Sequence, residues 1–198
     1  MSMKLSFPDT WAIVVAWVLA SLIGWVAGLV LGALLIQLVA LLPGLDEDRA
    51  FTSVVLLAIG AATGVAQSRV LARQLPHPMW WIVLTLIGSA LCVLVIAGAN
   101  WLKLGATTAW GNALLMATLG LAFGLPQWRA LRNTVAGAWV WLPAMMISFL
   151  PFTWLTIYPA HSLGELILVG SLLGALSAMI TGVVLARLVR RAGQAGVT

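Results

Sequence analysis

Long apolar runs separated by short polar breaks dominate the chain. Each run is long enough to cross the hydrocarbon core of a bilayer, which takes about 20 helical residues. The strands of a membrane barrel would alternate in polarity over ~10-residue segments, and these runs do not alternate. The pattern predicts an all-α membrane protein with six transmembrane helices. They are expected at about residues 11–39, 51–74, 79–99, 108–132, 138–157 and 163–191.

Prolines mark the boundaries and bends of these runs. Pro76 and Pro78 separate the second run from the third, because proline lacks a backbone N–H and disfavours helix in the residue before it. Pro126 predicts a kink near the end of the fourth run. Bends in the fifth run are predicted at Pro143 and Pro151.

The composition fits a chain that lies almost wholly in lipid. Of the 198 residues, 63% are hydrophobic and 8% are charged, whereas soluble domains carry about 25% charged residues. Six spans leave no length for a soluble domain, so we expect one transmembrane domain over residues 1–198. The first run exceeds the ~7–15 apolar residues of a signal peptide, which predicts a membrane helix there.

Cations gather at one end of the predicted helices. Eight lie on one side, and the other side carries only Arg49 and Lys103. An excess of Lys and Arg marks cytoplasmic loops, so we expect a multi-pass protein of the bacterial inner membrane with both termini cytoplasmic. This distribution accounts for the formal charge of +5, and no solvated basic segment indicates nucleic-acid binding. The eight cations are Lys4, Arg69, Arg73, Arg129, Arg132, Arg187, Arg190 and Arg191.

A two-helix pattern recurs along the chain. The second and fourth runs share five residues at an offset of 60, and the sixth run holds a weaker copy. Trp17, Trp81 and Trp141 each precede a small residue by seven positions. We therefore expect tandem helical hairpins over residues 11–74, 79–133 and 138–191, arranged about a pseudo-threefold axis along the membrane normal. The aligned positions are Gly60, Gly64, Gln67, Arg69 and Leu71, then Gly120, Gly124, Gln127, Arg129 and Leu131, then Ala178, Gly182, Leu185, Arg187 and Val189.

Gln67 and Gln127 are the candidate polar residues within the spans. At roughly 100° per residue, Gln67 shares a helix face with Gly64, while Arg69 points the other way. An amide in hydrocarbon requires a partner, because an unsatisfied polar group there costs several kcal/mol. Two interpretations stay open, namely an interhelical hydrogen bond and a small polar site.

Small residues predict where the helices pack. Lipid supplies no hydrophobic drive for helix association, so close approach of backbones at small residues must supply it. The predicted packing positions are Gly24, Gly28, Gly32, Gly60, Gly64, Gly120, Gly124 and Gly182.

Arginines and tryptophans concentrate near the predicted membrane surfaces. The arginines either snorkel to the interface and set topology, or contact anionic lipid head groups or an acidic partner. The candidate contacts are Arg69, Arg73, Arg129, Arg132, Arg187, Arg190 and Arg191. An aromatic belt is predicted for Trp80, Trp81, Trp101, Trp110, Trp128, Trp139, Trp141 and Trp154, and a mid-membrane packing role for Trp25.

The chain offers little catalytic chemistry. Glu165 is the only acid within a predicted span, which weakens ion-coupled transport. No P-loop, zincin or nucleophile-elbow motif occurs. Cys92 lies in an apolar run without metal-ligand neighbours, and His77 and His161 fall on opposite sides of the membrane. We expect no enzymatic activity, no metal and no cofactor.

One segment carries a resemblance. Residues 124–132, GLPQWRALR, followed by Trp139 and Trp141, resemble uncharacterised bacterial multi-pass membrane proteins with tandem Gly-x-x-Gln-Trp-x-x-Leu-Arg helical hairpins, found in filamentous phototrophs and related bacteria. The first copy departs from the pattern, with Ser68 in place of Trp and Ala72 in place of Arg. The resemblance implies the hairpin architecture and no activity.

Two functions follow as hypotheses. The excess of packing positions over polar chemistry favours a non-enzymatic subunit or scaffold of a membrane complex, with other membrane subunits or further copies of this chain as partners. The alternative is a component that binds or transports a small solute or lipid at a site between hairpins, with Gln67 and Gln127 as first contacts.

Overall fold

The computed structural model describes residues 10–41, 47–72, 74–75, 77–102, 108–158 and 162–195. These residues are mostly helical, and none of them forms a strand. Six segments are long and apolar enough to span a membrane, which confirms an all-α integral membrane protein. The elements are α1 Thr10–Val39, α2 Glu47–Leu71, α3 Pro78–Trp101, α4 Ala109–Leu131, η1 Ala138–Val140, α5 Trp141–Phe149, η2 Leu150–Phe152, α6 Thr153–Ile157 and α7 Leu163–Ala195.

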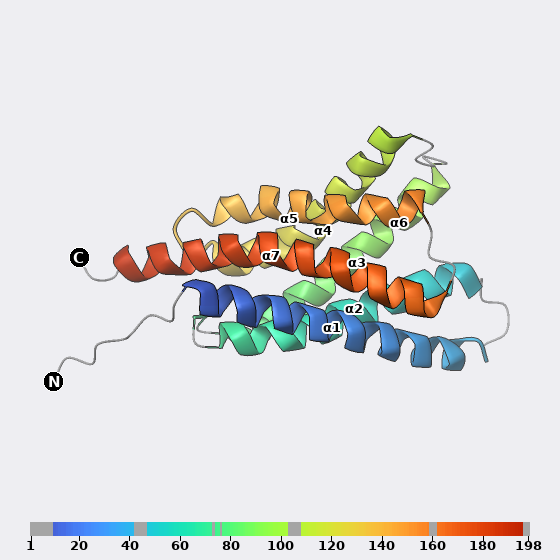
Figure 1. Ribbon diagram of the computed structural model, residues 1–198, viewed down its shortest axis with the longest axis horizontal. Helices are drawn as coiled ribbons and strands as arrows, with labels where there is room; N and C mark the ends of the chain where they lie inside the picture. Colours follow the sequence, from blue (N-terminus) through green and yellow to red (C-terminus); the bar gives the residue numbers. More distant parts are fainter. Residues whose placement is uncertain are drawn as a thin grey trace.

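The spans form a closed ring. Helices α1 to α5 pack side by side in chain order, and α7 closes the ring by lying against both α1 and α5 (Figure 1). The first and last helices are thus neighbours although they are far apart in the sequence. Thr10 of α1 and Ala195 of α7 lie at the same end of the bundle, which we call the terminal end (Figure 1).

The fifth span is broken into η1, α5, η2 and α6. Pro151 lies in η2, where the missing N–H interrupts the α-helical ladder and the backbone tightens into a 3₁₀ turn. The fifth span is thus interrupted at Pro151 by a 3₁₀ turn, and the bend itself stays a prediction. Pro143 lies in the first turn of α5, and the helix continues past it. Pro126 lies inside α4, which remains one helix to its end at residue 131.

Small residues let the helix backbones approach closely. A Cβ atom at Gly24 would collide with the backbone of Thr63, and one at Gly28 with that of Ile59, so α1 and α2 touch along their length. Gly60 and Gly64 of α2 face α3, and Gly120 and Gly124 of α4 face α5. Gly32 of α1 faces Val55, and Gly182 of α7 faces Trp17. In lipid such contacts supply the packing attraction that hydrophobic burial cannot.

Three tryptophans meet inside the ring. Trp17, Trp81 and Trp141 are at most 1% exposed. Their ring centroids lie 5.7, 5.9 and 6.0 Å apart, and each pair is edge-to-face. This is a geometry that the quadrupoles of aromatic rings prefer. We call these three residues the tryptophan triad.

The triad corrects part of the aromatic-belt prediction. The belt assignment is wrong for Trp81 and Trp141, because α3 and α5 turn these side chains toward the interior of the ring, where they are fully buried. The outer surface is broadly apolar, as contact with the bilayer requires. The other predicted belt residues except Trp128 are more than half exposed, namely Trp80, Trp101, Trp110, Trp139 and Trp154.

Candidate functional site

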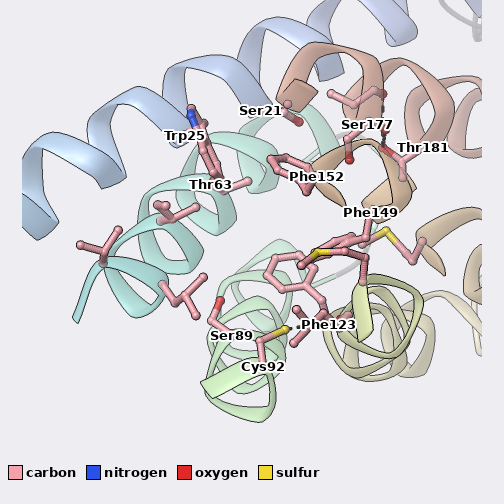
Figure 2. A pocket seen from close by; sticks show the side chains of 18 of the residues that line it. Ser21, Trp25, Thr63, Ser89, Cys92, Phe123, Phe149, Phe152, Ser177 and Thr181 are labelled. Atoms are coloured by element: carbon pink, nitrogen blue, oxygen red, sulfur yellow. Dashed lines mark hydrogen bonds between the residues drawn. The ribbon is translucent and has the colours of Figure 1, made fainter. Parts of the chain in front are cut away.

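A cavity of about 410 Å³ lies inside the ring (Figure 2). Trp17 and Trp141 of the triad lie at one end of its lining. The cavity also reaches Phe51 near the start of α2 and Leu166 near the start of α7. It therefore extends from the triad toward the end of the bundle opposite the terminal end.

Four aromatic side chains form a continuous strip on the cavity surface. Trp25 packs on Phe152 with ring centroids 5.6 Å apart, Phe152 on Phe149 at 5.9 Å, and Phe149 on Phe123 at 5.7 Å. All four line the cavity, and Figure 2 shows them together. We call this strip the aromatic wall. It offers flat, weakly polar surfaces to anything inside the cavity.

The break in the fifth span positions part of this wall. Residues three apart eclipse one another in a 3₁₀ turn. The η2 turn at Pro151 therefore brings Phe149 and Phe152 to the same side of the chain, facing the cavity. In an unbroken α-helix the two residues would also share a face, about 60° apart, so the 3₁₀ turn brings them closer to eclipsed.

Polar side chains gather where the cavity meets the triad. Trp81 Nε1 donates a hydrogen bond of 3.0 Å to Gln67 Oε1, and Gln67 Nε2 donates one of 2.9 Å to Ser21 Oγ. Gln67 is 6% exposed and uses both ends of its amide. It ties α1, α2 and α3 together.

Gln127 is placed similarly but is bonded differently. Its Nε2 donates a hydrogen bond of 3.1 Å to Thr85 Oγ1. Its Oε1 and the Nε1 of Trp141 are both buried and have no partner among the residues that the structure describes. Trp17 Nε1, in contrast, donates to Thr181 Oγ1 at 3.0 Å. Both glutamines thus make interhelical hydrogen bonds and also line the cavity, so the two interpretations are compatible.

The rest of the lining is uncharged. Ser89 Oγ donates to the backbone carbonyl of Thr85 at 3.1 Å, and Thr181 Oγ1 donates to that of Ser177 at 3.1 Å, so these hydroxyls are turned back to their own helices. Ser21 and Thr63 add two more hydroxyls. No charged side chain lines the cavity within the described part of the chain.

Cys92 also borders the cavity. It is buried, and its Sγ lies 3.4 Å from the carbonyl oxygen of Leu119, which is a packing contact between α3 and α4. Over the described ranges, no three His, Cys, Asp or Glu residues cluster closely enough to hold a metal ion.

The candidate arginines lie away from the cavity. Arg132 stacks on Trp128 with its guanidinium 5.3 Å from the ring centroid, a cation–π geometry. Arg129 lines a second hollow of about 380 Å³ together with His77 and Trp80. Arg73 lies outside the described residues. The exposed arginines are Arg69, Arg129, Arg132, Arg187, Arg190 and Arg191.

The sequence reasoning missed the triad and the aromatic wall. A signal for the triad was present, because Trp17, Trp81 and Trp141 occupy corresponding places in the repeated pattern. Corresponding residues of a ring can meet at its axis, which a belt residue cannot do. No comparable signal marked the wall.

No protein-family model matches the chain, and no curated protein and no solved structure matches it. The geometry of the cavity is therefore the main indication of function.

Proposed function

We propose that this integral membrane protein binds a small, uncharged, mainly apolar molecule in its central cavity. The observation that carries the proposal is a cavity of about 410 Å³ with an aromatic wall and a few polar groups at one end. Ligand sites are typically concave, about 300–1,000 Å³ in volume, and mostly apolar with a small number of placed polar groups.

The charge of the ligand follows from the lining. A buried ion is stable only beside a partner of opposite charge or a dense set of hydrogen bonds. The lining residues within the described chain supply amides, hydroxyls and indoles but no ionised side chain. An acid and base pair for catalysis is equally missing from this set, which supports binding rather than turnover.

The packing positions argue against the scaffold hypothesis as the first choice. That hypothesis was motivated by the number of small-residue seams. Gly28 contacts Ile59, Gly120 contacts the backbone of Met145, and Gly182 contacts Trp17, all within one chain. These seams are thus used for packing within the chain, so their number no longer motivates the scaffold role.

The proposal includes the arrangement of the chain in the membrane. It is a single domain of three two-helix units in the bacterial inner membrane, with the terminal end in the cytoplasm. Corresponding contacts support the units, because Gly24 packs on Thr63 within the first unit and Gly88 packs on Phe123 within the second. The exposed arginines support the orientation, since Lys and Arg favour the cytoplasmic face.

A second hollow supports contact with anionic lipid head groups. Its lining includes the cation of Arg129 and the apolar ring of Trp80. Hydrogen-bond donors are offered by His77, Asn133 and Thr134. Basic residues near an anionic leaflet gain about 1 kcal/mol each. This role is separate from that of the central cavity.

Thermal unfolding with naphthalene as the probe tests the proposed function. A ligand that binds only the folded protein raises its melting temperature in a saturable way. Ser177→Phe places a ring inside the cavity and is expected to abolish the rise. Met179→Phe is the matched control, because Met179 lies on the same helix but is 51% exposed. An unchanged melting temperature in the natural protein, or a rise that survives Ser177→Phe, contradicts the proposal.

A further inference from the structure

The three indole N–H groups of the triad differ in how they are satisfied. Trp17 Nε1 donates to Thr181 Oγ1, and Trp81 Nε1 donates to Gln67 Oε1, each at 3.0 Å. Trp141 Nε1 is buried and has no partner among the described residues. One donor of the triad is therefore unpaired within the described chain, and it belongs to a residue at the triad end of the cavity lining.

An open acceptor accompanies this donor. Gln127 is 1% exposed, and the bond from its Nε2 to Thr85 Oγ1 fixes one end of the amide. Its Oε1 has no partner within the described ranges. Gln127 and Trp141 both line the central cavity. Buried polar groups in folded proteins are nearly always paired, so an unpaired buried donor and an unpaired buried acceptor on two residues that line one cavity indicate a missing group.

At the α2–α3 interface, the corresponding glutamine and tryptophan are hydrogen-bonded to each other. Gln67 and Trp81 lie 60 residues before Gln127 and Trp141, and they bond directly. The two interfaces differ at the residue four positions after the tryptophan, which is Thr85 in α3 and Met145 in α5. A Cβ at Gly124 would lie 2.7 Å from both Cβ and Cγ of Met145. The longer side chain thus fills the space between α4 and α5 one turn from Gln127.

Resting on the binding function proposed above, the geometry points to a ligand that carries a hydroxyl group, held between Gln127 and Trp141. The hydroxyl oxygen accepts a hydrogen bond from Trp141 Nε1, and the hydroxyl proton is donated to Gln127 Oε1. A carbonyl would satisfy only the tryptophan, and a group that only donates would satisfy only the glutamine. The aromatic wall receives the apolar body, so the ligand class is an uncharged apolar alcohol or phenol.

Sealed equilibrium dialysis of the full chain in nanodiscs of neutral lipid tests this inference. The probes are naphthalene, β-naphthol and β-naphthoate, and binding to empty nanodiscs is subtracted for each. β-Naphthol is expected to bind about tenfold more tightly than naphthalene, which equals about 1.4 kcal/mol of binding free energy. β-Naphthoate is expected to bind most weakly of the three. Equal binding of naphthalene and β-naphthol overturns the hydroxyl subsite but leaves the proposed function intact. Absence of saturable binding for both overturns the proposed function itself.

Two variants test where the hydroxyl group of the ligand binds. Gln127→Leu is expected to remove the preference for β-naphthol over naphthalene, and Trp141→Phe is expected to reduce it while keeping an aromatic ring in the triad. Gln37→Leu is the matched control, because Gln37 lies in α1 and is exposed; its preference should equal that of the natural protein. A preference that survives both Gln127→Leu and Trp141→Phe contradicts the assignment.

Discussion

The α2–α3 and α4–α5 interfaces carry the same residue pattern but differ in their hydrogen bonds. In the first, Gln67 accepts from Trp81 and donates to Ser21, so the amide is fully used. In the second, Gln127 donates to Thr85 while Trp141 Nε1 has no partner among the described residues. The first interface is complete as a packing contact. The second leaves a donor and an acceptor unpaired within the described chain, on two residues that line the cavity, and the proposed binding site rests on this difference.

The two interfaces differ in a few side chains, whereas the arrangement of their helices is similar. Both even helices bring two glycines against the next odd helix. Thr85 is small and polar, whereas Met145 at the corresponding place is long and apolar, and it packs directly on Gly124. We propose that one pattern serves structure in the first copy and recognition in the second. Four comparisons, from the largest expected effect to the smallest, test this difference.

Replacing a triad tryptophan should have the largest effect. Trp81→Ala and Trp141→Ala each remove a buried ring, a change that costs about 3–5 kcal/mol in protein cores. Trp81→Ala also leaves Gln67 Oε1 unpaired, which adds about 1–3 kcal/mol. We expect Trp81→Ala to lower the free energy of unfolding more than Trp141→Ala, measured by denaturant unfolding in detergent. Equal losses would mean that the two interfaces are equivalent.

Replacing the glutamines should have the next largest effect. Gln67→Leu removes two hydrogen bonds and strands the buried Trp81 Nε1, so we expect a loss of about 1–3 kcal/mol. Gln127→Leu removes one hydrogen bond together with an acceptor that has no partner among the described residues, so the loss should be below about 1 kcal/mol. The same unfolding experiment compares them. A Gln127→Leu variant that is the less stable of the two would contradict the account.

Met145→Thr should convert the second interface toward the first. With a short side chain at residue 145, Trp141 Nε1 is expected to reach Gln127 Oε1 directly. The preference for β-naphthol over naphthalene should then fall by about tenfold, the effect of one such satisfied pair. Dialysis in neutral nanodiscs measures the ratio. Met146→Thr, one residue further along α5, is the control and should keep the ratio.

The smallest effect is expected at the corresponding arginines. Arg129 lines the second hollow and Arg69 does not. Arg129→Gln should weaken binding of phosphatidylglycerol by up to about fivefold, since one basic residue near an anionic surface contributes about 1 kcal/mol. Arg69→Gln should have a smaller effect. Native mass spectrometry with titrated lipid measures both effects. Equal effects would contradict lipid binding at the second hollow.

The helices could be predicted from the sequence because apolar length and proline positions decide them. The expected start and end of the first span, residues 11 and 39, lie within one residue of α1. The interruption of the α-helix at Pro151 is consistent with the missing backbone donor. Gln67 and Arg69 are two positions apart on a helix, so a buried glutamine and an exposed arginine followed from helical geometry.

The cavity could not be predicted in the same way. Tryptophan is amphipathic and suits both a membrane interface and a buried core, so Trp81 and Trp141 were placed wrongly. The aromatic wall also depends on contacts of Phe152 with Trp25 of α1 and of Phe149 with Phe123 of α4, which arise only when the helices pack. The unpaired groups of Gln127 and Trp141 could not be predicted either, because partners of such groups are set only when α4 packs on its neighbours.

The central claim is that the ring of helices binds a small apolar molecule at a defined site. Its most direct test is sealed equilibrium dialysis of naphthalene against the protein in neutral nanodiscs, with empty nanodiscs as the reference. The account predicts a saturable excess over the empty nanodiscs that Ser177→Phe removes and Met179→Phe retains. Uptake that rises linearly and equals that of the empty nanodiscs would contradict it.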